Sequence, residues 1–155
     1  VEAGNEVIPG LPEPSMVENS TEYDSARVAA LDAMLQIYGV KPFGVITADD
    51  FNTALVEKPE MVAMDVRTAE EVADGVIDTG DVELVVIPIQ DFIAQMSEWP
   101  AADAEVVVYC GSGHRSTMAL AMLGIFNYDT VSSLKGGFGG WKEAGFATTE
   151  FVAVP

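Results

Sequence analysis

The stretch that most constrains the fold is residues 106–125, where an apolar run, a loop and a helical pattern follow one another. Three valines and Tyr109 make up the apolar run, and Cys110 follows them directly. A glycine-containing loop then leads into a second apolar run, residues 118–125, with helical spacing. This order of strand, loop and helix is typical of parallel α/β sheets, in which ligands bind beyond the carboxyl ends of strands. The sequence therefore predicts that Cys110 lies at a ligand-binding edge.

The loop gathers reactive groups that are scarce in the chain as a whole. Cys110 is the only cysteine and His114 the only histidine, and Arg115 is a cation in a chain with 25 acidic and 7 basic residues. Glycines let backbone N–H groups turn inward, and the N-terminus of the following helix carries positive partial charge. With the guanidinium of Arg115, these groups favour the thiolate over a thiol whose ordinary pKa is about 8.5. The pattern predicts a nucleophilic sulfur in an anion-binding loop.

The loop resembles the active loop of the rhodanese superfamily of sulfurtransferases, which reads Cys-x-x-Gly-x-Arg between a strand and a helix. Two further motifs resemble the same family: residues 64–67 with acidic residues at 70 and 71, and residues 134–138 with Trp141. Together the motifs extend from about residue 43 to residue 146. The resemblance implies an α/β fold with a central five-stranded parallel sheet and helices on both faces.

The resemblance also implies a reaction. A single-domain sulfurtransferase of this kind moves sulfane sulfur from a small anionic donor, such as thiosulfate, to a thiol, cyanide or protein acceptor through a persulfide on Cys110. Arg115 would hold the donor or orient the loop by bonding to an acid beneath it, and His114 would face solvent as a binding group. The expected substrate-binding residues are Gly111, Ser112, Gly113, His114, Arg115 and Ser116. No cofactor is expected.

Asp65 and Arg67, which follow another apolar strand, have two interpretations. They tie the strand end and the next helix together through hydrogen bonds and an ion pair, or Arg67 adds positive potential at the rim of the pocket. We favour the first interpretation and treat both residues as supporting ones around the site.

Other functions of the loop compete with sulfur transfer as interpretations of its sequence. Residues 111–116 nearly match the dinucleotide fingerprint G-x-G-x-x-G, but the last glycine is missing. A cysteine phosphatase or arsenate reductase of this superfamily needs five residues between cysteine and arginine, whereas this loop has four. A sulfur-carrying or sulfide-sensing module that turns over poorly is an alternative of another class. Finally, a cysteine at a strand end can simply be buried and inert.

Composition excludes several classes of function. The formal charge is −18, which argues against nucleic acid and anionic membranes as partners. No apolar run reaches the roughly 18 residues of a membrane span. One cysteine and one histidine cannot build a zinc site from these ligand types, so no metal is expected. The acidic, proline-bearing N-terminal stretch fits an exported or periplasmic protein slightly better than a cytoplasmic one.

Hydrophobic spacing and turn residues divide the chain into four parts. These are a leader or linker (1–23), an N-terminal helical extension (24–40), the rhodanese-like domain (41–148) and a C-terminal tail (149–155). We expect helices at 24–38, 48–56, 91–99 and from the active loop to about 126, and strands at 44–47, 61–66, 84–87, 105–109 and 131–134. Residues 136–140 are expected to form a tight turn that brings Phe138 and Trp141 near the active-site face, before a short helix.

Overall fold

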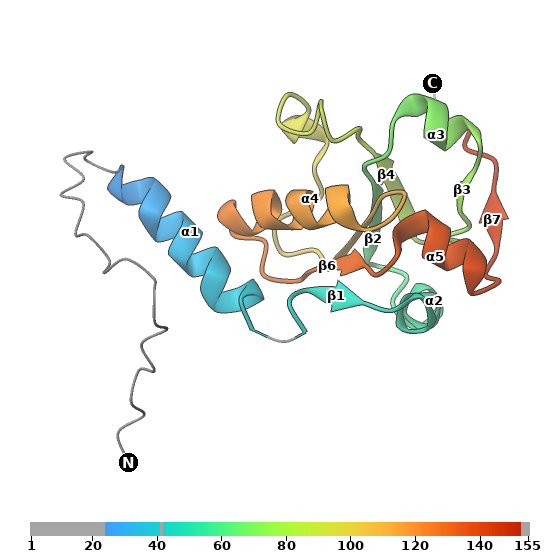
Figure 1. Ribbon diagram of the computed structural model, residues 1–155, viewed down its shortest axis with the longest axis horizontal. Helices are drawn as coiled ribbons and strands as arrows, with labels where there is room; N and C mark the ends of the chain where they lie inside the picture. The colour runs from blue at the N-terminus through green and yellow to red at the C-terminus, as the bar shows by residue number, and fades with distance from the viewer. Residues whose placement is uncertain (1–23, 41, 153–155) are drawn as a thin grey trace, which may run out of the picture.

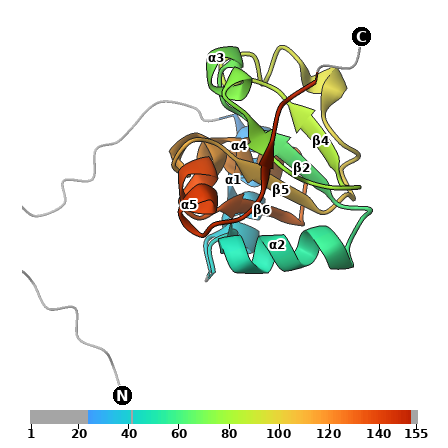
Figure 2. The same cartoon turned by 90° about the vertical axis from the view of Figure 1, so that its right-hand side faces the viewer.

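A five-stranded parallel sheet forms the centre of the computed structural model, which describes residues 24–40 and 42–152. Its strands lie in the order β1-β6-β5-β2-β4, and Figure 1 shows the sheet with the helices around it. β5 therefore occupies the middle of the sheet, and β4 lies at its outer edge beside β2 (Figure 2). The strand bounds are β1 Val45–Ile46, β2 Val62–Asp65, β4 Glu83–Val86, β5 Val106–Tyr109 and β6 Val131–Leu134. The predicted five-stranded parallel sheet is confirmed.

Within the described residues, five α-helices accompany the sheet: α1 Ser25–Tyr38, α2 Ala48–Glu57, α3 Ala69–Ala73, α4 His114–Ile125 and α5 Gly137–Glu143. Threonines cap two of them, as their spacing to an acid three residues later predicts. The hydroxyl of Thr47 accepts a hydrogen bond from the N–H of Asp50, and Thr68 forms a capping box with Glu71. None of the helices in this part of the chain has the length and apolar character needed to cross a membrane.

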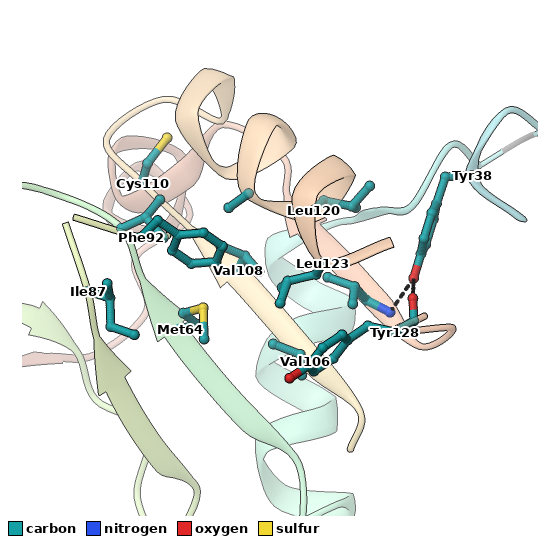
Figure 3. Close-up of a cluster of buried hydrophobic side chains, with 13 residues drawn as sticks. Tyr38, Met64, Ile87, Phe92, Val106, Val108, Cys110, Leu120, Leu123 and Tyr128 are labelled. Carbon is teal, nitrogen blue, oxygen red and sulfur yellow. Dashed lines mark hydrogen bonds between the residues drawn. The ribbon is translucent and has the colours of Figure 1, made fainter. Parts of the chain in front are cut away.

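Alternating side chains of β5 build a separate core on each face of the sheet. Val106 and Val108 point with Cys110 toward α1 and α4, where one cluster of buried side chains forms (Figure 3). Val107 and Tyr109 point to the opposite face, where residues of α2 and α5 complete a second cluster. A strand buried on both faces is a continuous apolar run, which is why its sequence does not alternate. Both clusters hold the end of β5, and hence Cys110, in a fixed position.

The N-terminal helix α1 completes the core on the α4 side. Tyr38, in its last turn, is buried and donates a hydrogen bond from its hydroxyl to the carbonyl of Tyr128 (2.6 Å). The same hydroxyl accepts a hydrogen bond from the N–H of Val131 (3.0 Å). α1 and α4 lie so close at Gly124 that a Cβ there would be 2.7 Å from the Met34 side chain. The helix predicted at residues 24–38 is thus confirmed as one packed on the domain.

The expected helix over residues 91–99 is wrong. Only Met96–Glu98 is helical there, as one 3₁₀ turn, η1, between turns and bends. The indole N–H of Trp99 donates to the carbonyl of Phe92 (3.0 Å), which an α-helix would offer to the N–H of Met96. The rings of Trp99 and Phe92 also lie with their centroids 4.7 Å apart. Aromatic packing in the core therefore overrides the helical spacing of this segment.

A second, two-stranded antiparallel sheet stands beside the first and is not predicted by the sequence. It joins β3 (Val76–Ile77) to β7 (Thr148–Thr149), with Val76 opposite Thr149. The indole N–H of Trp141 donates to the carbonyl of Ala147 (2.8 Å), which anchors the chain just before β7. Residues 148 and 149, where we expected the domain to give way to a tail, are therefore paired to the body of the domain.

Candidate active site

Cys110 follows β5 directly, and a left-handed turn at Gly113 carries the chain from it into α4. Gly113 has φ +101°, a conformation that residues with a Cβ rarely adopt. α4 begins at His114, so His114 and Arg115 belong to its first turn and not to the preceding loop. The carbonyl of Gly113 accepts hydrogen bonds from the N–H of Thr117 (3.2 Å) and from its hydroxyl (2.9 Å). The turn thus places a helix N-terminus directly behind the sulfur.

The sulfur of Cys110 is surrounded by hydrogen-bond donors. The residue is 1% exposed, and its Sγ accepts a hydrogen bond from the N–H of Gly113 (3.2 Å). The hydroxyl of Ser116 lies 3.7 Å from Sγ. Burial raises the pKa of the Cys110 thiol, but the donors around it, led by the N–H groups of Ser116 and Ser112, outweigh burial and hold the pKa below its ordinary value. The surroundings therefore favour the thiolate, as the sequence predicts.

A buried pair of serines supports this arrangement from below. The Oγ of Ser116 lies 2.8 Å from the Oγ of Ser133, a residue of β6, and donates to the carbonyl of Gly113 (3.0 Å). Both serines are buried. The single hydroxyl proton of Ser116 can serve either the Gly113 carbonyl or Sγ, and Ser133 can donate to the Ser116 oxygen. Ser133 connects the neighbouring strand to the thiol, a role that its place in a Val-Ser-Ser-Leu strand does not reveal.

Arg115 pairs with an acid, Glu71, across the loop. Its two terminal nitrogens donate to the two carboxylate oxygens, and both N–O distances are 2.6 Å. The hydrogen bonds from Arg115 lower the pKa of Glu71 to about 2, and the pKa of Arg115 is raised in turn. The side chains are 30% and 38% exposed, so the pair lies at the surface of the site. Of the two roles expected for Arg115, this geometry matches the orientation of the loop through an acid.

Asp65 and Arg67 form a buried ion pair under the site. The Nη2 of Arg67 lies 2.6 Å from the Asp65 carboxylate, and the side chains are 3% and 0% exposed. The guanidinium also donates to the carbonyls of Glu71 (3.0 Å) and Gly75 (2.8 Å), and it lies 4.0 Å from the ring centroid of Phe138. These contacts join β2, α3, α5 and the residue just before β3, and they favour the structural interpretation of the pair.

The first turn of α5 binds the carbonyl side of the active loop. The N–H of Phe138 donates to the carbonyl of Cys110 (2.7 Å), and that of Gly139 donates to the carbonyl of Gly111 (3.0 Å). A Cβ on Gly137 would lie 2.3 Å from the Cys110 oxygen, so only glycine permits this approach. The sequence predicts a turn here but not that the helix start itself holds the loop. Trp141 lies in the core beside α2, not at the active loop.

The side chains of Ser112 in the loop and His114 at the start of α4 face outward. Ser112 and His114 are exposed, and the Ser112 hydroxyl lies 2.9 Å from Nδ1 of His114. An open cleft of about 240 Å³ lies beside Gly111, bordered by charged side chains of both signs. It is lined by Arg67, Glu71, Asp74, Gly111, Phe138, Gly139 and Lys142. In the part of the chain that the structure describes, no group of three or more His, Cys, Asp or Glu residues is placed to hold a metal ion.

Comparisons with known proteins agree on one family. A family model described as Rhodanese-like domain matches residues 47–144. A sulfurtransferase of Allochromatium vinosum is 36% identical over 101 residues, which cover 64% of this chain and 89% of that protein. Protein HIGH ARSENIC CONTENT 1, mitochondrial, of Arabidopsis thaliana is 32% identical over 93 residues, and the chain spans 54% of that relative. A rhodanese-like domain from an Anabaena protein, 25% identical, superposes with a TM-score of 0.61 over 70% of this chain and 80% of that one.

Proposed function

The chain belongs to the rhodanese-like domain family, and we propose that it is a sulfurtransferase that carries sulfane sulfur as a persulfide on Cys110. The family match and the relative named sulfurtransferase support a sulfurtransferase-type role. Cys110 is the residue that we assign to sulfur transfer, because its thiol lies at the end of the central strand and the surrounding donors lower its pKa. A thiolate is the form of cysteine that attacks sulfur.

In the first half-reaction, the Cys110 thiolate attacks the outer sulfur of an anionic donor such as thiosulfate. A new S–S bond forms at Sγ, the sulfur–sulfur bond of thiosulfate breaks, and sulfite leaves with the bonding electron pair. The product is a persulfide whose terminal sulfur lies about 2 Å beyond Sγ. Cys110 is almost fully buried. In the persulfide, the atom that reacts with the acceptor is the added sulfur, one bond beyond the buried Sγ.

In the second half-reaction, an acceptor thiolate or cyanide attacks the terminal sulfur. The persulfide S–S bond breaks, its electrons return to Sγ, and Cys110 is again a thiolate. The acceptor leaves as a persulfide or as thiocyanate. We assign no separate general base to Cys110, because the hydrogen-bond donors around Sγ lower the pKa of its thiol.

The groups around Sγ supply the charge stabilisation that both steps need. Donors that stand in place before the reaction stabilise developing negative charge without the cost of reorganisation. Here these donors are the N–H of Gly113 and the other N–H groups of the loop, which Phe138 and Gly139 hold in position from behind. Arg115 orients the start of α4 through its fork to Glu71, and the charge of Glu71 balances that of the guanidinium.

Steady-state formation of thiocyanate from thiosulfate and cyanide tests the proposal. The wild-type protein is expected to turn over many times, and Cys110→Ser is expected to be inactive while folded. A single turnover followed by arrest, with cyanide and with a small thiol, would indicate a sulfur carrier rather than an enzyme. Turnover of an aryl phosphate or of arsenate by the wild type, lost in Cys110→Ser, would overturn the assignment in favour of a phosphatase or arsenate reductase.

A further inference from the structure

The edge strand β4 presents unpaired backbone to one side of the sheet. β4 is bonded to β2 alone in the central sheet and stands at its outer edge (Figure 2). The N–H of Ile87 donates to the carbonyl of Asp65 (3.0 Å), which lies opposite Val86 in the register. Because the N–H and C=O groups of successive strand residues point to opposite sides, those of Leu84 and Val86 point away from β2. Within residues 24–40 and 42–152, no other segment's backbone bonds to them.

A groove of about 600 Å³ runs along this edge. One wall is β4 with the residue after it, and the other wall is the segment from Ala94 to Glu98. The second wall is formed by turn residues and the 3₁₀ turn η1, where the sequence spacing predicts an α-helix. The ring contact and hydrogen bond between Trp99 and Phe92 hold this segment in turns instead. The groove is lined by Glu83, Val85, Val86, Ile87, Ala94, Gln95, Ser97 and Glu98.

The charge of the groove determines which partner it fits. Its charged lining residues are Glu83 and Glu98, and the whole chain has a formal charge of −18. Two copies of this chain would bring like charges together along their edges, which opposes self-pairing in the way that edge charges usually do. An extended segment with basic side chains would instead gain backbone hydrogen bonds from Leu84 and Val86 and favourable contacts with the two glutamates.

We propose that β4 and the Ala94–Glu98 segment form a docking site for an extended, lysine- or arginine-bearing segment of a partner protein. The segment adds as a further strand beside β4 and directs alternate side chains into the groove. The site is separate from Cys110 and does not depend on the chemistry assigned to that residue. The occupant can therefore be bound while the active loop remains free for donor and acceptor.

Binding of a defined peptide tests the proposal by NMR. The probe is a six-residue peptide of alternating lysine and valine with blocked ends, titrated into the ¹⁵N-labelled full chain. We expect the largest amide shifts at Leu84, Val86 and Gln95. N-methylation of alternate peptide residues should abolish binding when it falls on the side that faces β4 and leave binding unchanged on the other side. An absence of binding, or shifts centred elsewhere on the protein, would overturn the proposal.

Variants of the chain separate the contribution of the glutamate charges from that of the backbone hydrogen bonds of β4. Glu83→Gln combined with Glu98→Gln is expected to weaken peptide binding about fivefold at low salt, as for two exposed ion pairs. Glu57→Gln combined with Glu143→Gln removes the same charge from exposed positions outside the groove and serves as the charge-matched control. Val86→Pro removes an N–H that β2 does not use, so the ladder to β2 is kept while peptide binding is lost. Equal binding by all these variants would refute the site. Concentration-dependent dimerisation through β4, measured by sedimentation, would assign the edge to a second copy instead.

Discussion

Replacing Gly137 with alanine tests whether the start of α5 holds the active loop in its reactive geometry. A Cβ at this position would lie 2.3 Å from the Cys110 oxygen and 2.7 Å from the Ser112 nitrogen, both backbone atoms that cannot rotate away. Since heavy atoms pack best at about 3.5 Å, the loop must move by roughly 1 Å. A misplacement of about 1 Å costs roughly 100-fold in rate, or about 2.7 kcal/mol of transition-state stabilisation.

Gly145→Ala is the matched control, because Gly145 also has a positive φ (+81°) but no atom within 4 Å of the position of its Cβ. Both variants pay roughly 1–2 kcal/mol for alanine in the left-handed conformation. Urea unfolding and sulfur-transfer kinetics on the two variants separate the backbone strain, which both share, from the steric clash with the loop, which only Gly137→Ala introduces. We expect normal kcat/KM in Gly145→Ala and a loss of about 100-fold in Gly137→Ala. Full activity in Gly137→Ala, or equal losses in both variants, would refute the reasoning.

Three further variants, with Thr117→Ala as a control for the first, test Ser116, Arg115 and the acid that Arg115 binds. Ser116→Ala removes a hydroxyl donor near Sγ, so the pKa of the Cys110 thiol, measured as the inflection in alkylation rate against pH, should be higher than in wild type. Thr117→Ala, which removes a hydroxyl bound to the Gly113 carbonyl, should leave that pKa unchanged. Arg115→Lys keeps the charge but loses the fork; kcat/KM should fall by about 10- to 100-fold, and unfolding free energy by at most about 1 kcal/mol. Glu71 has its pKa lowered to about 2. Its ion pair therefore stabilises the protein above about pH 4.5 and is lost as pH falls toward 2, and Glu71→Gln should show a smaller loss of stability across that interval.

The central sheet and the position of the thiol could be predicted because local signals agree there. The apolar run before Cys110 is a strand buried on both faces, and Gly113 supplies the turn that the following helix requires. The threonine caps at positions 47 and 68 also depend only on residues within one turn. Each of these features is determined within a few residues of chain, so the sequence pattern contains it.

Features that depend on tertiary contacts could not be predicted in the same way. The helix expected at residues 91–99 fails because the Trp99 indole takes the carbonyl of Phe92. The partner of Arg115 lies 44 residues away in sequence, at Glu71. The hydrogen bonds from the α5 start to the active loop likewise need the folded arrangement of two distant segments. The sequence shows that residue 137 is glycine, but it does not show that a Cβ there would clash with the Cys110 carbonyl oxygen.

The most direct test of the central claim is mass spectrometry of the protein after treatment with thiosulfate. The account predicts one added sulfur atom on the peptide that contains Cys110, removed again by cyanide and absent from Cys110→Ser. Because Cys110 is the only cysteine in the chain, no other thiol can carry the sulfur. A thiol that remains unmodified after exposure to thiosulfate and to an organic persulfide would contradict the assignment of Cys110 as the sulfur carrier.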